Sequence, residues 1–228
     1  MARLTIDIFT VLDPSYYATD GQAALLDKVK KVLLKTYPKT PNISRNGQAV
    51  TINFTDFTVD VVPAFNRKGG GYLIPDSIGK KWISTDPKVH VELMNTENAE
   101  HSGNLVPLVK MMKGWNRTMI NYAFESFYLE LMTINILKNV TISDYPSGIR
   151  YVFDKGREKI KYTIADPVTY GEQIQGLRNV TTVKDAVSRF ETEYARAVKA
   201  EEFEKLEKTE SAIDEWRKIF GDYFPAYG

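Results

Sequence analysis

Two aspartates stand inside short apolar runs, an uncommon place for a carboxylate. Asp7 lies in residues 4–12 and Asp60 in residues 58–65, and both runs are rich in β-branched and aromatic residues. Burying an ionised carboxylate is costly unless it meets a cation or hydrogen-bond donors. If the two runs are neighbouring strands, the carboxylates converge at one edge of a sheet and offer the hard oxygen ligands that Mg²⁺ prefers. The alternative, equally open from spacing alone, is that each aspartate ends its strand or meets a lysine.

The N-terminal third of the sequence predicts a small sheet with one helix that positions these aspartates. The expected elements are a buried strand, an amphipathic helix, a hairpin that turns at Asn46-Gly47 and a further strand, over residues 4–12, 21–36, 43–54 and 58–65. The next stretch, residues 66–86, contains three consecutive glycines and is expected to be mostly loop.

The rest of the sequence predicts helices. Thr85-Asp86-Pro87 is typical of a helix start, because a capping side chain precedes a proline in the first turn. Periodic apolar residues predict helices over residues 104–115, 123–137, 151–160, 183–206 and 212–220. The pattern indicates an α+β protein with an N-terminal sheet, a helical C-terminal half and a seam near residues 80–90.

Composition excludes several classes of protein. The chain has 228 residues, no cysteine, two histidines and a net charge of +1. A disulfide framework and a thiolate zinc site are therefore excluded, and stable binding to nucleic acid is not expected. No apolar run reaches the length of a membrane-spanning helix, and no signal-peptide pattern follows Met1. A cytoplasmic protein that does not bind membranes is expected.

Six segments taken together resemble one family over nearly the whole chain, from about residue 4 to the C-terminus. They are IDIFTVLDPSYY, TVDVVPAF, GGYLIPD, KKWISTDP, NLVPLVKMMKGWN and WRKIFGDYFP. Their order and spacing are similar to those of the bacterial cGAS/DncV-like nucleotidyltransferases (CD-NTases), relatives of oligoadenylate synthetase. The resemblance implies a polymerase-β-like nucleotidyltransferase core over residues 1–85, a helical C-terminal lobe over residues 86–228 and a ligand cleft between them.

The resemblance also implies an activity. CD-NTases make cyclic di- or oligonucleotide second messengers from nucleoside triphosphates such as ATP, in the bacterial anti-phage signalling called CBASS. Two Mg²⁺ ions bridge the triphosphate in such enzymes and align the attacking hydroxyl with the leaving pyrophosphate. A regulatory protein partner is a further expectation.

Single positions carry over from the family pattern. Asp7 matches the second acid of the paired-acid strand, and Asp60 matches the third metal carboxylate, which also orients the attacking hydroxyl. Lys113 matches a lysine that reaches the triphosphate, although a solvated helix lysine is the commoner fate of this residue type. Ser126 matches a hydroxyl that contacts phosphate, against the alternative of a hydrogen bond within its own helix. Phe127, or Tyr128 next to it, is expected to stack on a base, and at least one of these two aromatics is expected to be a core residue.

Two departures from the family pattern bear on activity. Thr5 stands where the family has its first metal carboxylate, and a hydroxyl contributes no charge to a cation site. The Gly-Ser loop that grips the triphosphate in the family has no counterpart, since only Met1-Ala2-Arg3 precede the strand. Three explanations account for the missing carboxylate and loop. The sequence is a truncated form of an active enzyme, it is a pseudo-enzyme, or another chain supplies the missing parts. The direct start of the strand favours truncation, and binding of a nucleotide or partner without catalysis is the alternative function.

Overall fold

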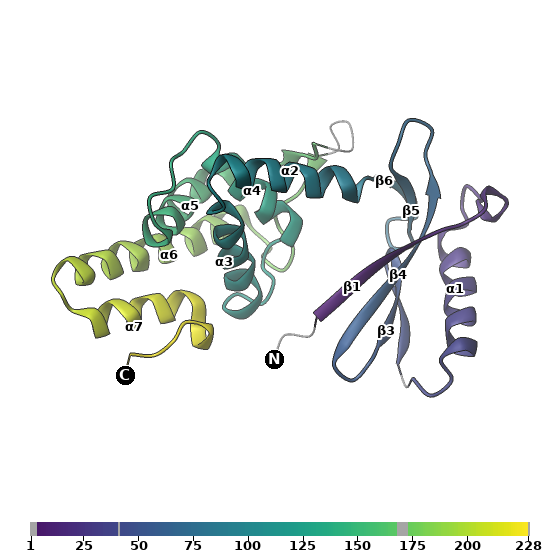
Figure 1. The fold of residues 1–228 in the computed structure, drawn as a ribbon, viewed down its shortest axis with the longest axis horizontal. Helices are drawn as coiled ribbons and strands as arrows, with labels where there is room; N and C mark the ends of the chain where they lie inside the picture. The colour runs from purple at the N-terminus through teal and green to yellow at the C-terminus, as the bar shows by residue number, and fades with distance from the viewer. Residues whose placement is uncertain (1–3, 41, 168–172, 228) are drawn as a thin grey trace. The chain divides into compact units, whose positions relative to one another are not determined.

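The computed structural model describes residues 4–40, 42–167 and 173–227 of the chain (Figure 1). It divides into two compact units, Met1–His90 and Val91–Gly228. The division falls inside helix α2 (Pro87–Glu100), five residues beyond the boundary expected from the sequence at residues 85/86. The segment 1–3 discussed above lies outside the described residues.

The first unit is built on a six-stranded mixed sheet. Its strands follow the order β2-β3-β4-β5-β6, and β1 adds to β4 in parallel. Their bounds are β1 (Leu4–Val11), β2 (Ile43–Asn46), β3 (Ala49–Asn53), β4 (Phe57–Asn66), β5 (Tyr72–Asp76) and β6 (Lys81–Thr85). Apart from β1 on β4, these strands pair antiparallel, and β2 and β3 form the hairpin expected at Asn46-Gly47. The predicted α+β class is confirmed.

Helix α1 (Gln22–Thr36) covers one face of this sheet. It follows a short 3₁₀ turn, η1 (Pro14–Tyr16), that Asp13 caps by accepting from the Ser15 N–H. The apolar side of α1 buries Leu26 completely against side chains of β2, β3 and β4. Among the described residues of the first unit, no helix covers the other face, and its polar side chains are exposed or half-buried, as Asp7 and Asp60 are.

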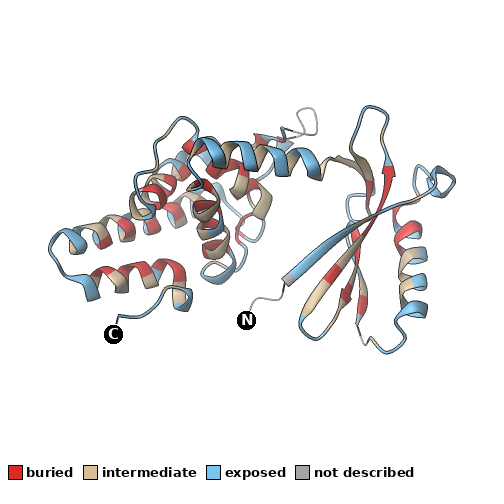
Figure 2. Cartoon of the chain, viewed as in Figure 1, coloured by how far each residue is buried: buried red, intermediate tan, exposed pale blue. Residues whose placement is uncertain are grey.

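The expectation that residues 4–12 form a buried strand is wrong. Ile6 is 41% exposed and Ile8 is 46% exposed, and β1 is mostly pale blue in Figure 2. The reason lies in the packing, since β1 pairs with β4 alone among the described strands, whereas α1 packs on β2, β3, β4 and β5. A run of apolar residues predicts a strand correctly but does not say that both of its faces are covered.

The expectation of loop over residues 66–86 is also wrong in part. Strands β5 and β6 form an antiparallel hairpin there, with Ile74 opposite Ile83 and Pro75 opposite Trp82. Glycines before the first strand and a proline inside it mask the strand pattern, but the aromatic and β-branched residues between them still favour a sheet.

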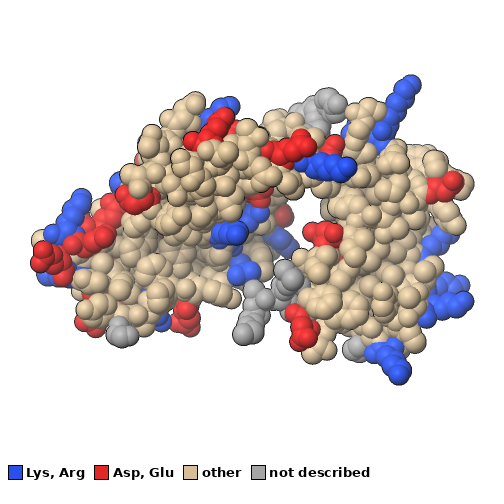
Figure 3. Space-filling model, viewed as in Figure 1, with Lys and Arg blue, Asp and Glu red and all other residues tan. Residues whose placement is uncertain are grey.

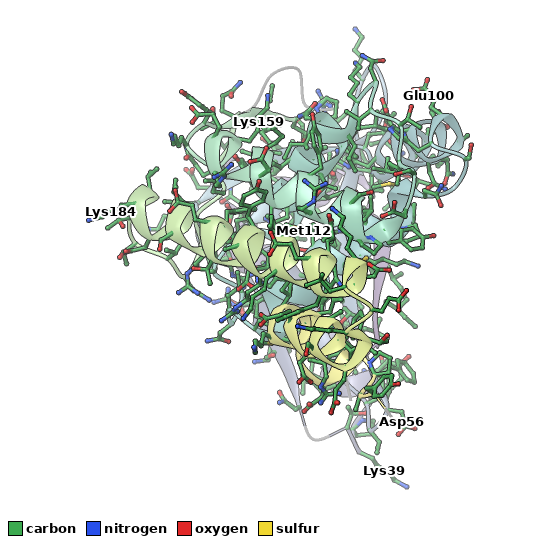
Figure 4. The ribbon with its side chains drawn as sticks, turned by 90° about the vertical axis from the view of Figure 1, so that its left-hand side faces the viewer. Lys39, Asp56, Glu100, Met112, Lys159 and Lys184 are labelled. Atoms are coloured by element: carbon green, nitrogen blue, oxygen red, sulfur yellow. The ribbon has the colours of Figure 1, made fainter. Side chains whose placement is uncertain are left out.

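The second unit is a helical bundle with a dense aromatic core. Its elements are α3 (Leu105–Thr118), α4 (Ser126–Leu137), α5 (Tyr145–Lys159), α6 (Val183–Lys205), α7 (Thr209–Phe220), the 3₁₀ turn η2 (Gly221–Tyr223) and a short pair, β7 (Ile164–Ala165) with β8 (Gln173–Ile174). Trp115, Phe153 and Phe190 are fully buried, and the Trp115 ring centroid lies 5.2 Å from each of the other two. Met112, labelled in Figure 4, is also fully buried in this core.

Three helices of the second unit begin elsewhere than the sequence indicated, and one of them, α7, begins three residues early at Thr209. Helix α5 begins six residues early, at Tyr145, because Asp144 caps it by accepting from the Ser147 N–H and Pro146 stands in its first turn. Helix α4 begins three residues late, at Ser126, because the side chain of Asn116 binds both the N–H and the carbonyl of Phe124 and holds that residue out of the helix. Among the described residues, no helix combines the length and apolar character needed to cross a bilayer.

Candidate active site

The pairing of β1 with β4 places Asp7 and Asp60 next to each other. The two strands run parallel, and Asp7 is the register partner of Asp60. Register partners on neighbouring strands point to the same face of a sheet, so both carboxylates stand on the face that α1 leaves open. Asp7 is exposed and Asp60 is half-buried. The structure therefore brings together the two acids that the sequence singled out.

The electrostatics of this pair reflect its closeness. Loss of hydration, and then the negative charge of Asp60, raise the pKa of Asp7 above its ordinary value. Two carboxylates that share a small region resist joint ionisation, and a cation between them relieves that repulsion. A divalent ion thus has a physical reason to bind here.

The sequence did not single out Thr51, which supports this pair. Thr51 is the register partner of Asp60 on β3, and its hydroxyl donates a hydrogen bond of 2.5 Å to the Asp60 carboxylate. This bond fixes one carboxylate oxygen and leaves the other available. The contact could be found only from the register of β3 on β4, which places Thr51 opposite Asp60 rather than one residue away.

A pair of hydroxyls lies at the position of the family's first metal carboxylate, which is Thr5 in this chain. Thr5 lies two residues before Asp7, on the same face, and is the register partner of Thr58. The two hydroxyls are hydrogen-bonded at 3.0 Å. No cluster of three or more acidic, histidine or cysteine side chains is found in the described part of the chain. The donor set is therefore two carboxylates with neighbouring hydroxyls, which suits a hydrated Mg²⁺ that also binds substrate phosphates.

The second unit holds the other predicted site residues. Lys113 lies on α3, is half-buried, and its ammonium forms an ion pair with Glu130 on α4. Ser126 is the first residue of α4. The carbonyl four residues earlier therefore lies outside the helix, and the Ser126 hydroxyl has no carbonyl of its own helix to bind at that spacing. Glu130 lies four residues after Ser126, on the same side of α4. The sequence did not identify Glu130, although this spacing was a usable signal.

The two aromatics beside Ser126 differ in their surroundings. Phe127 is half-buried and packs against the core of the second unit. Tyr128 is fully buried, and its hydroxyl donates to the carbonyls of Lys159 and Tyr162. Burial raises the pKa of Tyr128 to about 12. Tyr128 is thus a core residue, as one of the two was expected to be.

Helix α3 presents a basic side around Lys113. Lys110, Lys113 and Arg117 recur at helical spacing, and α3 contains no acidic residue. Blue side chains gather over this helix in Figure 3. A cavity of about 290 Å³ opens beside it, with Lys110, Arg117 and Phe220 among its lining residues. Such a surface favours anions.

Comparison with known proteins gives the same assignment as the motifs. The Second Messenger Oligonucleotide or Dinucleotide Synthetase (SMODS) domain matches residues 1–98. A probable cyclic nucleotide synthase of Bacillus cereus (strain VD146) is 28% identical over 215 residues, which cover 89% of this chain and 63% of that protein. The cyclic AMP-AMP-AMP synthase of an Acinetobacter species is 26% identical over 235 residues, covering 98% of this chain and 66% of that protein. The chain thus spans slightly less than two thirds of the length of these relatives.

Solved structures share the fold. Vibrio cholerae DncV cyclic AMP-GMP synthase, in complex with a linear intermediate, superposes with a TM-score of 0.77 at 16% identity, over 97% of this chain and 64% of DncV. Escherichia coli MS115-1 CdnC with ATP gives a TM-score of 0.69 at 18% identity, over 97% of this chain and 78% of CdnC. The polymerase-β-like architecture expected from the motifs agrees with these matches.

The domain match, the curated relatives and the fold all indicate similarity to the same kind of protein. The matched SMODS region contains β1 and β4 with Asp7 and Asp60, and the sequence relatives extend over the helical unit as well. Residues 1–98 are thus similar to the SMODS domain, and the chain over most of its length is similar to cyclic nucleotide synthases.

Proposed function

We propose that the chain is a nucleotidyltransferase that makes cyclic oligonucleotides from nucleoside triphosphates. The observation that carries the proposal is the Asp7–Asp60 pair, two carboxylates in register on parallel strands of an open sheet face. Both curated relatives are named as cyclic nucleotide synthases, which supports the reaction class. ATP is proposed among the substrates because E. coli CdnC is solved with ATP. The biological setting that we propose is CBASS anti-phage signalling.

We propose that Asp7 and Asp60 hold Mg²⁺. Bound there, the metal would supply charge neutralisation at the transferred phosphate and activation of the attacking hydroxyl. The protein side of the site is preorganised, because Thr51 fixes one oxygen of Asp60 and β1 holds Asp7 beside it. Asp60 is proposed to orient the attacking hydroxyl with its other oxygen. Thr5 contributes no negative charge, so the site binds the metal less strongly than three carboxylates would.

The second unit is proposed to bind the nucleotide. Lys113 would neutralise phosphate charge, Ser126 would donate a hydrogen bond to a phosphate oxygen from the first turn of α4, and Phe127 would stack on a base with the part of its ring that the core leaves exposed. The basic side of α3 and the positive end of the α4 dipole both favour phosphate near these residues.

A second function is favoured by one specific observation. Thr5, at the position of an expected carboxylate, is already hydrogen-bonded to Thr58. A family member that binds a nucleotide or a protein partner without catalysis would show this arrangement. E. coli CdnC is solved in complex with HORMA-deltaN, and a regulatory protein partner for this chain is proposed on that ground.

One experiment separates the two functions. The purified chain is incubated with Mg²⁺ and labelled ATP, GTP, CTP and UTP, and products that resist phosphatase are separated by chromatography. The enzyme proposal expects such products, their loss in Asp60→Asn, and no change in the matched control Asp56→Asn, which removes an exposed carboxylate in the turn before β4.

The variant Thr5→Asp completes this test. A carboxylate at position 5 should raise product formation, because a third negative ligand beside Asp7 and Asp60 strengthens the cation site. Saturable nucleotide binding without product, from both the natural chain and Thr5→Asp, would support the non-catalytic function. No binding of any nucleotide would contradict the enzyme proposal and would leave only the binding of a protein partner for the non-catalytic function.

A further inference from the structure

The ion pair between Lys113 and Glu130 couples two helices at the proposed phosphate-binding residues. Lys113 lies on α3 and Glu130 on α4, and these helices pack against each other. The Lys113 side chain is 35% exposed and the Glu130 side chain 18% exposed. The pair is therefore partly exposed, neither freely solvated nor deeply buried. A ligand can reach it and separate the two side chains.

Glu130 lies close to where a phosphate would be held. Ser126 opens α4, and Glu130 follows on the same side one turn later. A phosphate bound at the first turn of α4 would lie within one helical turn of this carboxylate. The repulsion between two negative groups at that separation is appreciable in a partly desolvated setting.

Lys113 differs from the other two cations on its side of α3. No ion pair of Lys110 or Arg117 is found within the part of the chain that the structure describes, whereas Lys113 is neutralised by Glu130. The lysine assigned to the triphosphate is thus the one that already has an anionic partner. A nucleotide that engages Lys113 therefore competes with Glu130 for the ammonium.

We propose that Glu130 is a positioning residue that acts as an internal counter-ion for Lys113 and limits the affinity for nucleoside triphosphates. This inference rests on the proposed function, since it requires that Lys113 contacts the triphosphate. Glu130 holds the ammonium at the α3–α4 contact, and the triphosphate exchanges with it. The same charge discriminates against metal-free triphosphate, because the penalty grows with the negative charge of the ligand and bound Mg²⁺ reduces that charge.

A purely structural ion pair predicts different behaviour. If Glu130 only braces α3 against α4, its neutralisation lowers stability and leaves nucleotide affinity unchanged or weaker. A counter-ion that competes with phosphate predicts tighter binding when its charge is removed. Gain of affinity is an outcome that misfolding or loosened packing does not produce.

The test measures binding of ATP, with and without Mg²⁺, to the full chain by calorimetry. The variants are Glu130→Gln, Lys113→Gln and the double variant, and the matched control is Glu201→Gln. Glu201 pairs with Arg150 at 2.7 Å, and the side-chain exposures of 17% and 32% are similar to those of the Glu130–Lys113 pair. Thermal unfolding of each variant shows whether it is folded.

We expect Glu130→Gln to bind ATP about fivefold more tightly, with a larger gain for ATP alone than for Mg²⁺-ATP. Lys113→Gln should weaken binding, and Glu201→Gln should match the natural chain. The double variant should bind somewhat more tightly than Lys113→Gln, because the direct repulsion between Glu130 and the phosphates is gone, but by a smaller factor than Glu130→Gln gains over the natural chain. Equal or weaker binding by folded Glu130→Gln, while the natural chain binds, would overturn the inference and leave the proposed function intact. Absence of binding by the natural chain would overturn the proposed function and this inference with it.

A second measurement covers a Glu130→Gln variant that fails to fold. Carboxyl ¹³C signals of glutamate are followed in the unmodified chain during titration with Mg²⁺-ATP. Exchange of partners predicts a shift of the Glu130 signal at saturation and no shift of the Glu201 signal. An unmoved Glu130 signal in a chain that binds ATP would contradict the proposal.

Discussion

At the scale of single residues, the raised pKa of Asp7 has a consequence for stability. The folded state binds the Asp7 proton more strongly than the unfolded state does, because partial burial and the charge of Asp60 disfavour its ionised form. The free energy of unfolding therefore falls as pH rises from the ordinary pKa of 3.8 through the raised folded value. Above that window, ionised Asp7 carries a constant penalty.

The substitution Asp7→Asn should remove this penalty. We expect a gain in the free energy of unfolding of up to about 1 kcal/mol at pH 7, kept small because the side chain is solvent-exposed. The gain should vanish near pH 3, where the natural residue is protonated. Urea denaturation at both pH values measures it, and a variant less stable than the natural chain at pH 7 would contradict the repulsion between Asp7 and Asp60.

Thr51 offers a second test at this scale. Replacement by valine keeps the shape of the side chain and removes the hydroxyl that donates to Asp60. Loss of this half-buried, charge-assisted hydrogen bond should lower the free energy of unfolding by about 1 kcal/mol. The control Thr10→Val alters an exposed threonine of β1 and should have little effect. Equal stability of Thr51→Val and the natural chain would show that the contact is not maintained in solution.

The residues that the sequence could and could not reveal differ in a simple physical way. Asp7 and Asp60 were visible because a carboxylate within an apolar strand stands out from its immediate neighbours. Thr51 and Glu130 look ordinary in the sequence and acquire their roles from strand register and from the packing of α3 on α4. Local pattern predicts the first kind of residue, whereas the second kind depends on tertiary contacts.

At the scale of elements, His101 joins the C-terminal ends of two helices. Its Nδ1 lies 2.7 Å from the carbonyl oxygen of Glu97 in α2, and its Nε2 lies 2.9 Å from that of Leu137 in α4. A neutral imidazole can donate from only one nitrogen, so satisfying both carbonyls requires the protonated ring. Burial would lower the pKa of His101, but the two hydrogen bonds and the charges of Glu97 and Glu100 outweigh it and raise that pKa.

This link predicts a pH-dependent stability. The stabilisation is full below the ordinary pKa of 6.5 and is lost as pH rises through the raised folded value. His101→Gln should lower the free energy of unfolding by about 1–2 kcal/mol at pH 5.5 and by less at pH 9. Urea denaturation across this range measures the difference. The chain has two histidines, so NMR can follow the His101 ring directly, and a midpoint at or below 6.5 would contradict the prediction.

Elements were predicted well where a periodic pattern was uninterrupted, and poorly where it was broken. Helix α1, the β2–β3 hairpin and strand β4 lie within two residues of their predicted bounds. Strands β5 and β6 were missed because Pro75 and the preceding glycines resemble loop chemistry, although Pro75 pairs with Trp82 in the sheet. The exposure of β1 could not be read from its sequence, because burial depends on which strands α1 covers.

At the scale of the whole molecule, the boundary between the units lies within a helix rather than in a loop. Helix α2 contains residues of both units and has no buried residue along its length, whereas α4 has eight. Figure 2 shows α2 as largely exposed or intermediate. The proposed metal ligands lie in the first unit and the proposed phosphate ligands in the second. Helix α2 is therefore the segment that connects the two sets of proposed ligands.

Stability should therefore vary along the chain, with α2 weaker than the bundle that follows it. Local opening is easiest where few apolar side chains are buried. We expect backbone amides of α2 before Leu93, which packs on the core of the second unit, to exchange with deuterium about tenfold or more faster than those of α4. Hydrogen exchange with mass spectrometry measures this, and the amides of α6, a long helix with five buried residues, serve as a second protected reference. Equal protection in α2 and α4 would mean that the connecting helix is as firmly held as the core, and that the two units open as one.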